Sequence, residues 1–261
     1  MDTQIDRRKL VTWLGGLAGA GAAATLVAHA QPAVATNNSA AALQNLPWPY
    51  KPHEPDKAVD RAFAGFYKGE CMYGTFEAIV GPVAEQLGSP YKDFPFMMFK
   101  YGGGGIKGWA TICGTLNGAA AAIQLLSPDP DPLINALFAW YERESLPDVH
   151  PKGAKYPEVR SVADSPLCHQ SIAQWTKVSH KHAYSPERSE RCASLAASVA
   201  KKAIELLNEQ AAGKPAAFAL PQATQGCMSC HEKGGPVENI RTKMNCGGCH
   251  APMLKNHPSK L

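Results

Sequence analysis

The segment WATICGTLNGAAAAIQLL, residues 109–126, carries no charged residue along its whole length. Ile112, Leu116 and Ile123 recur at helical spacing, and alanines and glycines fill many of the positions between them. A helix that is apolar on every side is usually a buried one, and small residues allow its neighbours to approach closely. The segment therefore predicts a buried helix that packs tightly against the rest of the fold.

Further helical patterns flank this segment on both sides. Asp56 is placed to cap one helix, and Ser185 followed by Pro186 is a strong start for another. Alternation typical of strands is almost absent, so the fold class is predicted to be mostly α. We expect the other helices over residues 56–67, 71–87, 132–144, 166–178 and 186–210.

The patterns divide the chain of 261 residues into four parts. Residues 1–30 are a leader, residues 31–55 a proline-rich extended arm, residues 56–212 a helical body domain, and residues 213–261 a small C-terminal segment with little regular structure. With 45% hydrophobic and 18% charged residues, the body can bury a core. The net charge of +4 is not gathered into a basic stripe, so no nucleic-acid partner is expected.

The leader has the features of an export signal. Arg7 and Arg8 precede a short apolar run rich in Gly and Ala, and Ala28-His29-Ala30 offers a cleavage site. The paired arginines favour a twin-arginine signal, and a Sec signal that happens to contain two arginines is the alternative. The run is too short and too rich in glycine for an anchor. The cleaved protein is therefore expected in the periplasm, without stable membrane insertion.

The C-terminal segment contains two C-x-x-C-H motifs, Cys227-Met228-Ser229-Cys230-His231 and Cys246-Gly247-Gly248-Cys249-His250. In such a motif the two thiols form thioethers with the vinyl groups of one haem, and the adjacent His binds the iron. The motifs predict two haem c groups per chain, with His231 and His250 as proximal ligands. A zinc ribbon also uses paired C-x-x-C motifs, but the His after each pair and the export signal oppose that alternative.

Only fourteen residues separate His231 from Cys246, so the two haems are expected to lie close together. A segment this short cannot enclose two haems, so the helical body or a second subunit has to cover them. We favour histidine as the distal ligand, and hence a low potential, whereas Met228, Met244 or Met253 would raise it. The candidate distal histidines are His257, His182, His180 and His53.

Four more cysteines are spread through the helical body: Cys71, Cys113, Cys168 and Cys192. Their wide spacing fits no local metal motif. Outside the cytoplasm they could form two disulfides in three possible pairings, remain as buried thiols, or bind an iron–sulfur cluster. Such a cluster is usually inserted in the cytoplasm and then requires export of a folded protein. The twin-arginine signal therefore favours the cluster.

Four consecutive glycines occupy positions 102–105. A phosphate-binding loop would need a following G-K-[ST] and a preceding strand, and neither is evident. A close backbone approach, between helices or against a cluster, explains the glycines better.

The surroundings of the body cysteines resemble a family of redox-active proteins named for its spaced Cys and Gly pattern. The stretches that carry the resemblance are residues 69–74, 101–119, 165–169 and 191–192. With the leader and the two C-x-x-C-H motifs, residues 46–257 are similar to the split-Soret cytochromes c of sulfate-reducing bacteria. This resemblance implies a homodimer, two bis-histidine haems packed nearly parallel in each subunit, and an iron–sulfur cluster on the body cysteines.

The resemblance also implies that a distal His can come from the other subunit. The chain departs from the family at Cys71-Met72, where many members have paired cysteines. The four remaining body cysteines are still enough for a [2Fe–2S] cluster.

Together these features predict an electron-transfer protein rather than an enzyme, with redox proteins as its partners. Histidine on both faces of each iron leaves no open position for a substrate. The alternative is a haem oxidoreductase acting on a small substrate such as a nitrogen oxide or a metal ion, which needs a vacant iron position. A zinc-binding structural module is a third possibility.

Overall fold

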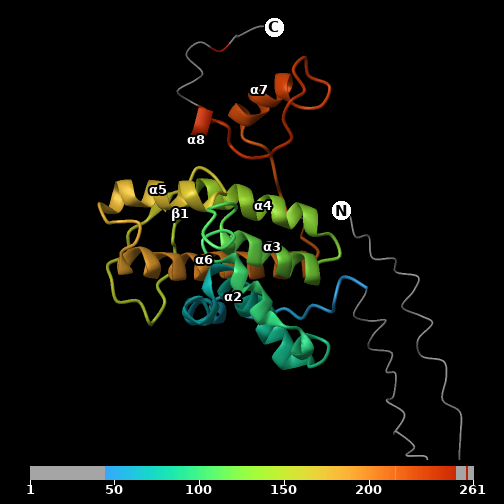
Figure 1. Ribbon diagram of the computed structural model, residues 1–261. Coiled ribbons are helices and arrows are strands. Elements are labelled where there is room, and N and C mark those ends of the chain that lie inside the picture. The colour runs from blue at the N-terminus through green and yellow to red at the C-terminus, as the bar shows by residue number, and fades with distance from the viewer. Residues whose placement is uncertain (1–44, 215, 251–256, 258–261) are drawn as a thin grey trace, which may run out of the picture. The chain divides into compact units, whose positions relative to one another are not determined.

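Helices make up most of the part of the chain that the structure describes (Figure 1). The computed structural model describes residues 45–214, 216–250 and 257, so the predicted export signal and the first part of the expected arm lie outside the described residues. In chain order the elements are α2 (Lys57–Leu87), the 3₁₀ helices η1 (Tyr91–Asp93) and η2 (Phe96–Gly102), α3 (Gly114–Leu126), α4 (Pro130–Arg143), β1 (Ser145–Leu146), β2 (Ser161–Val162), α5 (Cys168–Ser179), α6 (Pro186–Ala211), α7 (Gln222–His231) and α8 (Gly247–His250). The two strands pair antiparallel over two residues each, and the predicted mostly α fold class is confirmed.

The α2 segment is a helical hairpin rather than one straight helix. Its backbone leaves helical geometry at Gly69 and Glu70, and Glu70 has a φ of 70°. Arg61 forms ion pairs with Glu77 at 2.5 Å and with Glu85 at 2.7 Å, which are 16 and 24 residues further along the chain. Sixteen residues of straight helix would span about 24 Å, so the two halves fold back on each other. The prediction of two helices in this part of the chain is confirmed.

Helix α3 begins later than the sequence predicts. We expected a helix over residues 109–126, but the first helical residue is number 114. The preceding residues pair instead with a distant part of the chain. Cys113 donates its N–H to the Pro166 carbonyl at 2.8 Å, and Cys168 donates its N–H to the Thr111 carbonyl at 2.8 Å. These tertiary hydrogen bonds hold residues 111–113 extended and bring two cysteines to neighbouring positions.

The remaining helices lie close to their predicted positions. Ser185 caps α6 as expected, because its Oγ accepts the N–H of Arg188 at 3.1 Å. Asp56 precedes α2 as expected but makes no capping hydrogen bond with its side chain. It forms an ion pair with Lys201 at 2.5 Å instead, so the prediction of a capping role for Asp56 is wrong.

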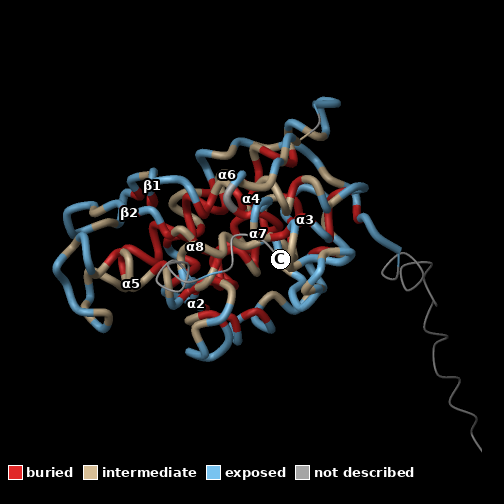
Figure 2. The backbone as a smooth tube through the Cα atoms, turned by 90° about the horizontal axis from the view of Figure 1, so that it is seen from above, coloured by how far each residue is buried: buried red, intermediate tan, exposed pale blue. Residues whose placement is uncertain are grey.

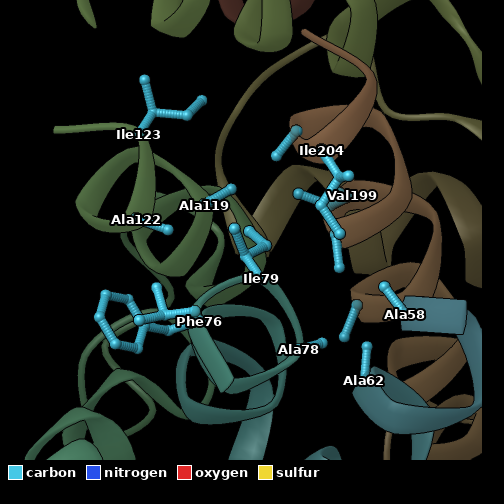
Figure 3. Packing of buried hydrophobic residues seen from close by; sticks show 14 of the residues in the cluster. Ala58, Ala62, Phe76, Ala78, Ile79, Ala119, Ala122, Ile123, Val199 and Ile204 are labelled. Atoms are coloured by element: carbon cyan, nitrogen blue, oxygen red, sulfur yellow. The ribbon is translucent and has the colours of Figure 1, made fainter. Parts of the chain in front are cut away.

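The core of the helical body lies where α2, α3 and α6 meet. Figure 3 shows Ile79 of α2 between Ala119 of α3 and Val199 of α6, and all three residues are fully buried. Buried residues follow these helices and exposed residues follow the loops (Figure 2). Among the described residues, no helix has both the length and the apolar character that a membrane span requires.

The close contact between α2 and α3 predicts a strong effect of adding one methyl group. A Cβ at Gly118 would lie 2.4 Å from the carbonyl oxygen of Met72. Gly118→Ala should therefore lower the free energy of unfolding by about 1–3 kcal/mol through overpacking, as measured by denaturant titration. Gly226→Ala in α7 is the control, because a Cβ there meets nothing within 4 Å. Equal stabilities of the two variants would contradict this packing.

Candidate redox site

The four body cysteines are far apart in the sequence and all buried in the helical body. Cys71 follows the break in α2, Cys113 precedes α3, Cys168 opens α5 and Cys192 lies in the second turn of α6. Their exposed fractions lie between 4% and 7%, and all four are free thiols. Four separate elements therefore bring their cysteines into the interior.

The thiols lie close enough for the charge of one to shift the pKa of another. Burial raises the pKa of Cys71 well above its ordinary value, and the thiols of Cys192, Cys113 and Cys168 raise it further. Burial also raises the pKa of Cys168 to about 12, with Cys113 and Cys192 as the next causes. The four cysteines thus share one buried electrostatic environment.

The arrangement of the four thiols bears on the kind of metal centre that they could hold. Within the described ranges, no group of three or more His, Cys, Asp or Glu side chains could hold one metal ion. Zinc draws its sulfur ligands to about 2.3 Å, so the arrangement does not suit a structural zinc. An iron–sulfur cluster contains several atoms, and its thiolates bind different irons. Ligands of a cluster therefore do not need to converge on one point.

The backbone of the glycine run, residues 102–105, lies beside these thiols. The N–H of Gly104 donates a hydrogen bond to the Cys71 sulfur, which lowers the pKa of that thiol against the effect of burial. On the same side, a Cβ at Gly114 would lie 2.8 Å from Cys71 Cβ and 2.1 Å from the Gly102 carbonyl oxygen. The close backbone approach predicted for the four glycines is confirmed, and it lies against the cysteines.

Two buried polar side chains beside the thiols were not predicted from the sequence. Tyr141 lies within hydrogen-bonding reach of the Cys113 thiol, and its hydroxyl donates to Ser171 Oγ at 3.0 Å. Arg191 donates from Nη1 to the same Ser171 oxygen at 3.0 Å. The position of Arg191 next to Cys192 was the only signal in the sequence, because a sequence does not distinguish a buried arginine from an exposed one.

The two C-x-x-C-H motifs meet in the C-terminal segment. The first lies at the end of α7, which finishes at His231, and the second forms α8, which finishes at His250. Burial raises the pKa of Cys246, and the neighbouring Cys227 thiol raises it further. The cysteines and histidines of both motifs are half-buried or exposed. That the segment cannot enclose two haems alone stays a prediction.

His231 is oriented by a residue that the sequence analysis did not single out. Its Nδ1 lies 2.8 Å from Oδ1 of Asn239, which leaves Nε2 as the atom suited to bind iron. Histidines that ligate metals commonly use their second ring nitrogen for such a hydrogen bond. The ring of His257 lies 5.8 Å from the ring of His231 at an angle of 56°. The structure therefore brings the predicted distal candidate His257 to the first haem motif.

The other three distal candidates lie outside the C-terminal segment, one on the arm and two in the helical body. His53 is half-buried on the arm, where its carbonyl accepts a hydrogen bond from Asn208 of α6 at 2.9 Å, and burial lowers its pKa. His180 ends α5 with a φ of 55°, and His182 follows in the exposed turn before α6. Haem ligation by these three histidines stays a prediction.

Asn245 ties the second haem motif to the helical body. Its N–H donates to Glu142 Oε1 at 3.3 Å, and its Nδ2 donates to Asp164 Oδ1 at 2.5 Å. Glu142 is buried, and this burial raises its pKa. Lys243 adds a more exposed hydrogen bond to Asn135 at 2.9 Å. These contacts hold the second motif against the end of α4.

Comparison with known proteins identifies relatives that match most of the chain. A family model described as "Putative redox-active protein (C_GCAxxG_C_C)" matches residues 73–206. The protein "Split-Soret cytochrome c" of Desulfovibrio desulfuricans is 37% identical over 268 residues, and the match covers 95% of each chain. A solved structure, described as showing "a novel iron centre in the split-Soret cytochrome c" of the same organism, has a TM-score of 0.72 and 38% identity. That match covers 80% of this chain and 95% of the other.

Loss of the Asn245 side-chain hydrogen bond should release the second motif from the body. Asn245→Leu keeps the backbone N–H that binds Glu142 but removes the Nδ2 donor to the Asp164 carboxylate, and a hydrogen bond to a charged group contributes about 1.5–3 kcal/mol. We therefore expect limited proteolysis of the haem-loaded protein to cut the segment after residue 213 about tenfold faster or more. Asn135→Leu removes only the exposed bond to Lys243 and should leave the rate unchanged. Equal rates for both variants and the unmodified protein would contradict this docking.

Proposed function

Because this chain belongs to the split-Soret cytochrome c family, we propose that it is an exported electron-transfer protein with two haem c groups and one iron–sulfur cluster per chain. The observation that carries the proposal is the meeting of two haem-attachment motifs at Cys227 and Cys246. The body of the same chain gathers four buried thiols. Redox proteins of the periplasm are the expected partners.

The C-terminal segment would hold both haems through residues of its two motifs. When bound, each haem iron takes up and releases one electron. Asn239 fixes the ring of His231 through Nδ1, so that Nε2 is the ligand atom. The residues proposed for haem binding are Cys227, Cys230 and His231 for the first haem, and Cys246, Cys249 and His250 for the second.

His257 is our proposed distal ligand of the first haem, because its ring lies beside that of His231. His180, His182 and His53 remain the candidates for the second haem. The exposure of His180 and His182 would allow a second subunit to receive one of them. We therefore propose a homodimer in which such a ligand would cross from one subunit to the other.

The body cysteines suit an iron–sulfur cluster of the [2Fe–2S] type. Four cysteine thiolates are the usual donor set of such a cluster, and burial protects these thiols from solvent. The hydrogen bond from Gly104 to the Cys71 sulfur is of the kind that tunes cluster potentials. The iron centre named for the Desulfovibrio desulfuricans relative supports the same assignment.

The position of His257 also favours an electron carrier over a haem oxidoreductase. An enzyme that reduces a nitrogen oxide or a metal ion at haem needs a vacant iron position. A histidine on each side of the first iron would fill both axial positions. Electrons would then enter and leave through contact with redox proteins rather than through a bound substrate.

Metal analysis of anaerobically purified protein tests the cluster. We expect two haems per chain by the pyridine haemochrome assay, further iron outside the haems, and acid-labile sulfide. Cys113→Ser should abolish the sulfide and retain both haems, because Cys113 lies in the body and far from the haem motifs in the sequence. Iron confined to haem, with no sulfide, would overturn the cluster assignment.

Removal of the proposed distal ligand tests the haem assignment. His257→Ala should convert one ferric haem from low spin to high spin and allow it to bind cyanide, as measured by EPR and visible absorption. His150→Ala is the control, because His150 is exposed and only approaches Glu158 at 3.9 Å. A wholly low-spin spectrum in His257→Ala would show that the distal ligand comes from elsewhere.

A further inference from the structure

Arg191 is a buried cation of the helical body. Only 6% of the residue is exposed. Nη1 donates to Ser171 Oγ at 3.0 Å and Nη2 to Ser161 Oγ at 3.5 Å, while Nε has no hydrogen-bond partner. In the described part of the chain, no carboxylate forms an ion pair with this guanidinium. Burial of an unpaired charge is strongly unfavourable, so this region requires a negative charge.

The described carboxylates that line the same cavity as Arg191 form no ion pair with it. Arg191 lines a cavity of about 150 Å³ together with Glu158, Glu187 and Glu190. Each of these carboxylates is engaged by another group. The partners are Arg160 for Glu158, Lys181 for Glu187, and the backbone N–H groups of Lys155 and Tyr156 for Glu190.

The four cysteines are a further source of negative charge close to Arg191. Arg191 directly precedes Cys192 on α6, and Ser171, which accepts the Nη1 hydrogen bond, lies one turn after Cys168 on α5. In agreement with this placement, the charge of Arg191 lowers the pKa of the Cys168 thiol. Cysteine binds metal as the thiolate. A cluster held by four thiolates carries a net negative charge that grows when the cluster is reduced, and net charge is one determinant of its potential. A fixed positive charge nearby therefore favours the reduced form.

We propose that Arg191 is the internal counter-charge of the four-cysteine centre, and that it stabilises the bound cluster and raises its reduction potential. The inference rests on the cluster in the proposed function. Ser171 and Ser161 hold the guanidinium, and Tyr141 in turn holds Ser171. Arg191 is therefore preorganised for this positioning role and does not ligate the iron.

The reduction potential of the cluster gives the first test, by EPR-monitored redox titration of the full-length, haem-loaded protein. Arg191→Met removes the charge and keeps most of the side-chain volume, whereas Arg191→Lys keeps the charge but loses the planar fork. We expect a lower potential in Arg191→Met and an intermediate one in Arg191→Lys. Arg188→Met is the matched control, because Arg188 also acts on Cys168 but is partly exposed and screened by water.

Thermal unfolding gives a second readout that a merely structural role would not produce. Arg191→Met should lower the Tm of the protein that holds its cluster. The same substitution should raise the Tm after the cluster has been removed with an oxidant and a chelator, because a buried unpaired charge is then lost. A steric or hydrogen-bonding role would shift both Tm values in the same direction.

The outcomes separate this inference from the proposed function. Unmodified protein without acid-labile sulfide would overturn both. A cluster whose potential is unchanged in Arg191→Met would overturn the counter-charge alone, as would Tm shifts of equal sign. If Arg191→Met does not accumulate, Arg191→Gln, which also removes the charge, is compared with Arg188→Gln. A lower potential in the first variant only supports the inference, and equal potentials overturn it.

Discussion

The close approach of α3 to α2 is the constraint on which the rest of the structure depends. Gly114 and Gly118 leave no space for a side chain between the two elements, and this contact brings the start of α3 against Cys71. The same contact lets α2, α3 and α6 form one core around Ile79. Because the hairpin break at Gly69 immediately precedes Cys71, the packing that builds the core also places the first thiol.

A second constraint is the backbone pairing that joins residues 111–113 to residues 166–168. Because of this pairing, α3 lacks the first turns that the sequence predicts. In exchange, the N–H groups of Cys113 and Cys168 obtain hydrogen-bond acceptors. Buried backbone groups require partners, so this pairing is a stable alternative to the helix. The four thiols, the glycine backbone and the Arg191 guanidinium therefore lie together in the interior of the body.

The body and the C-terminal segment differ in how deeply their cysteines are buried. The body buries its thiols almost completely, whereas the haem motifs leave theirs half-buried or exposed. A covalent thioether bond can hold a haem without a closed pocket, so the segment needs little core of its own. Asn245 then fixes the second motif on the body through two carboxylates. In the proposed function, cover for the haems would then come from the body or from a second subunit.

The sequence by itself determined the features that depend on neighbouring residues. The haem motifs were evident because attachment chemistry demands a contiguous C-x-x-C-H, and the start of α6 was evident because Ser185 and Pro186 act within one turn. Only the tertiary structure decided where α3 begins, how Arg191 is buried and which residues Asn245 contacts. Each of these depends on groups that lie far apart in the chain, such as the Cys113 N–H and the Pro166 carbonyl. Local pattern carries no information about such pairs, because their energies arise only when the helices have packed.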